Sequence, residues 1–180
     1  MRALLVALLL AVSTPAWALL CDGRNSTLEA RAKHITGISG MLAKSLDRIE
    51  TVPPDVSAYI EREEAAALDQ QREARFNLVI SNPFYRAHEV QGHYKIVREN
   101  LEAARTANSV ADQVVHLSEA LSHSSELKEA LSSYYDYDAS RQQRVLGQDG
   151  VKRASFTMTV RKSMILEALQ CGVRQMREPQ

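Results

Sequence analysis

Apolar residues recur every three or four positions along most of the chain, from about residue 28 to about residue 177. This spacing gathers them on one side of a helix, so that the apolar sides of several helices can pack together. No alternating run of apolar and polar residues is long enough to indicate a strand. Ala, Leu, Glu, Arg, Gln and Ser dominate the composition and favour helix as well. The sequence therefore predicts an all-α protein.

Proline, glycine and N-cap signals divide this pattern into five segments. The breaks fall at Pro53-Pro54, Asn82-Pro83, Asn108-Ser109 and Gly147–Gly150. Short connections between helices favour antiparallel neighbours, so we expect an up-and-down bundle of four to five helices in one domain, residues 19–180. The expected helices span about 28–50, 56–80, 83–106, 109 to the turn at 147, and 151–177.

The fourth segment has the most regular pattern. Three-four spacing connects Val110, Val114, Leu117 and Leu121, then Lys128, Leu131 and Tyr135, with Ser124 in the gap between the two groups. The serines of 122–125 indicate a break, because serine competes for local backbone hydrogen bonds. At the start of the first helix, Ser26-Thr27-Leu28-Glu29 fits a capping box. Asn25-Ser26-Thr27 also matches a glycosylation acceptor, but the capping role explains the same residues.

Residues 1–18 are typical of a cleaved secretory signal. Arg2 precedes the apolar run Ala3–Val12, and Ala16-Trp17-Ala18 places small residues two apart. The alternative, a retained anchor, is disfavoured because crossing a bilayer takes roughly 20 apolar residues. We expect cleavage after Ala18, a periplasmic or secreted mature protein, and no stable membrane insertion after cleavage.

The two cysteines, Cys21 and Cys171, lie near the two ends of the mature chain. In an oxidising compartment such a pair favours a disulfide, which would join the termini. The alternatives are two free thiols and a lipidated Cys21. Lipidation is disfavoured because Leu20 stands where a small residue is required.

The charge balance argues against nucleic acid as a partner. Removing Arg2 with the signal leaves 21 basic residues against the 22 acidic ones. Binding phosphates needs an excess of lysine and arginine on one face.

No motif indicates a catalytic set. His88-Glu89-Val90-Gln91-Gly92-His93 is similar to a zinc-protease helix, but its histidines are five apart and point about 140° from each other. The chain has no C-x-x-C-H, P-loop, Rossmann or G-x-S-x-G pattern. These absences favour a non-enzymatic protein that needs no cofactor.

His116, Glu119 and His123 form a candidate metal site. Their offsets of three and seven put them on one face of the fourth helix, where they could hold zinc or copper. A further ligand would have to come from another helix, and the remaining imidazoles are His34, His88 and His93.

Tyr134, Tyr135 and Tyr137 hold half of the chain's six tyrosines. One interpretation is a patch that binds another protein, since tyrosine is a rigid, amphipathic contact residue. The other is a helix end where one or two rings close the bundle. Our first hypothesis is an exported protein that binds another protein, in the manner of an inhibitor or immunity protein, a chaperone or a secretion-system accessory protein. The alternative hypothesis is metal binding on the fourth helix.

Overall fold

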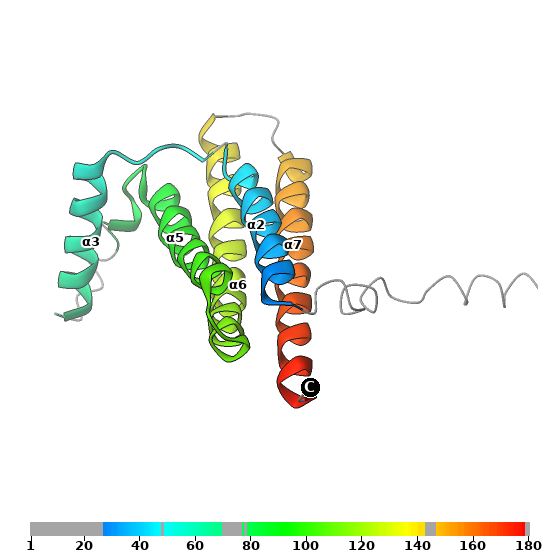
Figure 1. Cartoon of the computed structure of the whole chain (residues 1–180). Helices are drawn as coiled ribbons and strands as arrows, with labels where there is room; N and C mark the ends of the chain where they lie inside the picture. The colour runs from blue at the N-terminus through cyan, green and yellow to red at the C-terminus, as the bar shows by residue number, and fades with distance from the viewer. Residues whose placement is uncertain (1–26, 48, 70–76, 78, 143–146, 179–180) are drawn as a thin grey trace, which may run out of the picture.

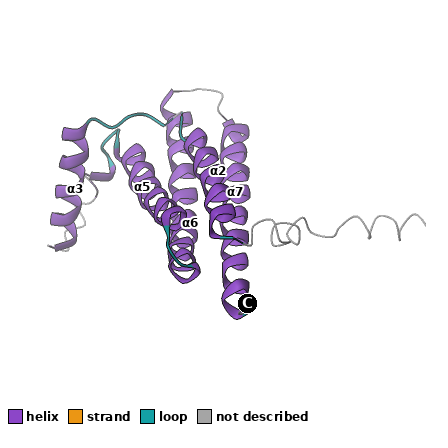
Figure 2. Ribbon diagram, viewed as in Figure 1, coloured by secondary structure: helices purple, strands orange, loops and turns teal. Residues whose placement is uncertain are grey.

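The computed structural model describes residues 27–47, 49–69, 77, 79–142 and 147–178, and these contain five helices and no strand (Figures 1 and 2). The all-α prediction is confirmed. The predicted signal, residues 1–18, lies outside the described residues. None of the described helices is both long and apolar enough to span a membrane. The helices are α2 (Leu28–Ser45), α3 (Pro54–Asp69), α5 (Tyr85–Thr106), α6 (Val110–Gln142) and α7 (Gly147–Arg177).

Four of these helices form a bundle. α5 packs on α6, α6 on α7, and α2 closes the ring by packing on both α5 and α7. Figure 1 shows that neighbours in this ring run antiparallel, as the short connections predict. α3 lies beside the ring and meets it at α5. The architecture is thus a four-helix bundle with a lateral helix.

Side-chain caps fix two helix starts. The Thr27 hydroxyl accepts a hydrogen bond from the Ala30 amide at 3.1 Å, one residue later than the predicted capping box. The Ser109 hydroxyl accepts from the Asp112 amide at 3.1 Å and begins α6 where the sequence predicts a start. Two predicted limits are wrong. α2 ends at Ser45, earlier than the apolar spacing indicates, and α7 includes Gly147–Gly150, which the sequence predicted as a turn.

α6 is continuous through the serines at which a break was expected. Ser124 is buried, and its hydroxyl donates to the Leu121 carbonyl at 2.6 Å, so it is satisfied inside the helix. The stripe that faces the core continues through Leu127, which is fully buried. Lys128, which the spacing placed on this stripe, lies on the flank of the helix. The main core is shared by all four bundle helices, and α6 contributes Leu117, Ala120, Leu127, Ala130 and Leu131 to it.

A buried arginine connects three helices at one end of the bundle. Arg31 of α2 is 2% exposed and donates through Nε to Gln113 Oε1 of α6 and through a terminal nitrogen to Gln175 Oε1 of α7. Gln113 in turn donates to the Ala104 carbonyl at 3.2 Å. Burial lowers the pKa of the Arg31 guanidinium. The two glutamine oxygens accept hydrogen bonds from most of the Arg31 guanidinium. Among the described residues, no carboxylate pairs with its charge.

α3 packs on the start of α5 through a small second core of Ile60, Val79 and Tyr85. The Ser57 hydroxyl lies 3.1 Å from His88 Nδ1, which connects α3 to α5 again. Burial, together with Glu89 and Glu64, raises the pKa of the Tyr85 hydroxyl. α3 is therefore attached at one turn of α5 and contributes little to the main core.

Cys171 is buried on α7, at 6% exposure. Its predicted partner, Cys21, lies outside the described residues, so the bridge between the two ends of the chain stays a prediction.

Candidate metal centre

Three potential metal ligands meet where α5 packs on α6. His93 comes from α5, and His123 and Glu126 come from α6. Glu126 Oε2 lies 2.7 Å from His123 Nδ1 and 3.4 Å from His93 Nδ1. One ligand atom from each residue lies within 4.8 Å of the other two. Two imidazoles and a carboxylate therefore point at one small volume.

The spacing of these atoms suits a small transition-metal ion. Zinc binds histidine nitrogen and carboxylate oxygen at about 2.0–2.2 Å, so neighbouring ligands of a tetrahedral ion lie about 3.4 Å apart. The distance from Glu126 Oε2 to His93 Nδ1, 3.4 Å, matches this value, whereas the 2.7 Å to His123 Nδ1 is a hydrogen-bond distance. A histidine pair with one carboxylate is also a ligand set that zinc and iron(II) sites use.

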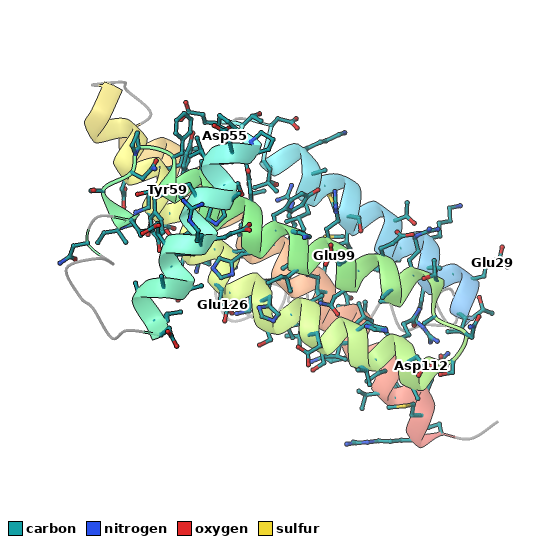
Figure 3. All side chains as sticks on the ribbon, turned by 90° about the vertical axis from the view of Figure 1, so that its left-hand side faces the viewer. Glu29, Asp55, Tyr59, Glu99, Asp112 and Glu126 are labelled. Carbon is teal, nitrogen blue, oxygen red and sulfur yellow. The ribbon has the colours of Figure 1, made fainter. Side chains whose placement is uncertain are left out.

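The helices hold these groups at fixed positions. His123 and Glu126 are three residues apart on α6 and share one face of that helix. The buried Val90 and Val97 anchor the turns of α5 on either side of His93 in the main core. Seen from the α3 side, Glu126 lies on the exposed flank of α6 (Figure 3). Rigid helices reduce the cost of ordering the ligands on binding.

The site is partly open to solvent. The side chains of His93, His123 and Glu126 are 32%, 30% and 50% exposed. Three protein ligands leave a coordination position for water, which is the arrangement of an open rather than a closed structural site. Part of each side chain is therefore in contact with solvent, although His93 Nδ1 itself is buried.

Without a metal, Glu126 interacts with both imidazoles. His123 Nδ1 lies at hydrogen-bond distance from the carboxylate, while His93 Nδ1 is buried and makes no hydrogen bond. A metal ion requires a lone pair on each coordinating nitrogen, so binding displaces any proton from those atoms. The unsatisfied His93 nitrogen is the part of this cluster that a metal would complete.

The predicted ligands His116 and Glu119 do not join this cluster. His116 Nδ1 lies 3.4 Å from Asn100 Oδ1 of α5, and Glu119 is exposed. Of the predicted set, His123 alone takes part in the described cluster. Sequence reasoning missed Glu126, although the spacing His123-x-x-Glu126 is a local signal for it. It did identify His93 as one of the imidazoles that could come from another helix.

The remaining histidines lie apart from this cluster. His88 pairs with Ser57, so the two histidines of the 88–93 segment do not share a site. His34 is half-buried on α2, its Nε2 has no hydrogen-bond partner, and burial lowers its pKa. The zinc-protease interpretation thus fails on geometry as well as on spacing.

The tyrosine segment is mostly core. Tyr134 and Tyr135 are each 7% exposed, and their rings pack edge to face with centroids 5.8 Å apart. The Tyr134 hydroxyl accepts a hydrogen bond from the Glu50 amide at 3.1 Å. Burial favours the interpretation in which these rings close the bundle over the one in which they form a partner-binding patch. The side chain of Tyr137 lies outside the description.

Comparison of the chain with protein-family models, curated proteins and solved structures finds no match. Fold and site together define a helical bundle with a candidate His₂Glu metal centre between two adjacent helices.

Proposed function

We propose that this chain is an exported helical-bundle protein that reversibly binds one divalent transition-metal ion, with zinc the best fit. The observation that carries the proposal is the convergence of His93, His123 and Glu126 from two helices. Nitrogen and oxygen ligands in this ratio favour zinc over calcium or magnesium, which take mostly oxygen ligands. The partial exposure of all three side chains supports exchange with the surrounding medium.

Metal binding would also stabilise the bundle. A bound ion connects α5 to α6 through ligands from both helices, and it binds the folded chain better than the unfolded one. At a free zinc concentration 100 times the dissociation constant, the gain is about 2.7 kcal/mol. For a chain of this size, such a gain raises the melting temperature by about 5–10 °C.

We expect the mature protein to bind one zinc ion, measured by calorimetric titration and by elemental analysis after desalting. His93→Ala, His123→Ala and Glu126→Gln should each weaken binding by about 100-fold or more. Loss of a ligand costs at least as much as loss of the outer groups that orient ligands, which reaches about 100-fold. The same variants should lose the rise in melting temperature on adding zinc.

His116→Ala and Glu119→Gln are the matched controls, because they change the same residue types one or two turns away on α6. Both should bind zinc as the unchanged protein does. Weakened binding in these two variants, with normal binding in His93→Ala, would transfer the site to the face predicted from sequence. Absence of zinc binding by the unchanged protein would end the proposal.

Export is the second part of the proposal, and the cysteines give it a chemical test. We expect the mature protein to show no reactive thiol when unfolded without reductant and two after reduction, because Cys21 and Cys171 would be joined. A bridge across about 150 residues stabilises by about 4–5 kcal/mol, so reduction should lower the free energy of unfolding markedly. Two reactive thiols before reduction would contradict the bridge. Mass spectrometry of the purified mature chain also tests the start at residue 19.

Protein binding stays a prediction beside metal binding. The burial of Tyr134 and Tyr135 removes the residues that motivated it most directly.

A further inference from the structure

A second site lies on another flank of α6, in a groove between α6 and α7 of about 610 Å³. This volume is within the range of small-molecule sites, about 300–1,000 Å³. Every residue that lines the groove is polar. Five come from α6 and two from α7: Ser125, Lys128, Glu129, Ser132, Ser133, Thr159 and Lys162.

The groove has a positive balance. Lys128 and Lys162 face the single carboxylate of Glu129, which leaves one excess positive charge. The Lys162 ammonium donates a hydrogen bond to the Ser125 hydroxyl, which holds it over the groove. Within the described part of the chain, neither ammonium is paired with a carboxylate. Both lysine side chains are half-buried, which strengthens their attraction for an anion.

The contact between Ser125 and Lys162 invites a catalytic interpretation, which the helix excludes. A serine nucleophile needs hydrogen-bond donors that stabilise the developing oxyanion, and these are commonly backbone N–H groups beside the serine. Ser125 lies in the middle of α6, where the backbone N–H groups already bond within the helix. The groove is therefore equipped for binding and not for acyl transfer.

We propose that the α6/α7 groove binds a small anionic sugar, with an oxyanion on a hydroxyl-rich body. Lys162 and Lys128 hold the phosphate or carboxylate, and the hydroxyls of Ser132, Ser133 and Thr159 and the carboxylate of Glu129 meet the sugar hydroxyls. Charge-assisted hydrogen bonds give most of the affinity, and the hydroxyls distinguish a sugar from a bare anion. This site is independent of the metal centre.

The test is titration of the full mature protein at low ionic strength, followed by calorimetry and amide chemical shifts. The probes are glucose 6-phosphate, glucuronate, glucose and inorganic phosphate. We expect saturable binding of at least one of the first two, and weaker binding of glucose and of inorganic phosphate. Lys162→Met should raise the dissociation constant about tenfold, the cost of one charge-assisted bond. Lys128→Met should act in the same direction, and Lys95→Met, an exposed lysine of α5, should have no effect.

Failure of both anionic sugars to saturate would overturn the proposal. Binding of glucose as tight as that of the anionic sugars would also overturn it, because the lysines would then contribute no affinity. Binding of inorganic phosphate as tight as that of the sugars would do the same, because the hydroxyls would then contribute none. Equal effects of Lys162→Met and Lys95→Met would show nonspecific attraction. Comparison of glucose 6-phosphate with glucuronate tells which oxyanion the groove prefers.

Discussion

Replacing Gln113 by alanine is expected to lower the free energy of unfolding by about 3 kcal/mol. Gln113 is 1% exposed and makes two hydrogen bonds, accepting from Arg31 and donating to the Ala104 carbonyl. Its loss leaves a buried guanidinium short of an acceptor and a backbone carbonyl short of a donor. Removing an acceptor from a buried charge costs more than never having buried the charge. Urea denaturation measures the change, with the m-value unchanged.

The arginine itself gives the sharper comparison. Arg31→Met in the Gln113→Ala background removes the buried charge and should recover much of the lost stability, because an apolar side chain of similar length needs no acceptor. Gln170→Ala, an exposed glutamine of α7, should change stability by less than about 0.5 kcal/mol. Equal effects of Gln113→Ala and Gln170→Ala would contradict the network as described.

Leu117→Ala is the second change with a large expected effect, a loss of about 2–5 kcal/mol. Leu117 is fully buried in the main core, so truncation removes apolar contacts and leaves a cavity. Thermal and urea unfolding both report the loss.

Val115→Ala, two residues earlier on the same helix, is the matched control for this change. Val115 is 59% exposed, and its truncation should alter stability by less than about 0.5 kcal/mol. A similar loss in both variants would mean that α6 presents a different face to the core.

The helices could be predicted from the sequence because their spacing and caps are local. Ser109 and Asp112 mark the start of α6 in the sequence, and the structure places it there. The face that a long helix buries is harder to predict. The apolar spacing places Lys128 on the face of α6 toward the core, but the buried residue is Leu127. Which of the two faces the core depends on how α7 packs on α6.

The candidate metal site was predictable in part. The pair on α6 is visible as His123-x-x-Glu126, but a histidine and a carboxylate on the same face occur at Glu119 as well. What distinguishes Glu126 is its position opposite His93, and that depends on the relative register of α5 and α6. Gln113 illustrates the same limit, since its burial follows from the position of Arg31 on a third helix.

The most direct test of the metal centre is anomalous X-ray diffraction at the zinc absorption edge, from crystals of the mature protein grown with one equivalent of zinc. The account predicts a single strong peak about 2.0–2.2 Å from nitrogens of His93 and His123 and from an oxygen of Glu126. A zinc peak on His116 or Glu119, or no peak between α5 and α6, would contradict it.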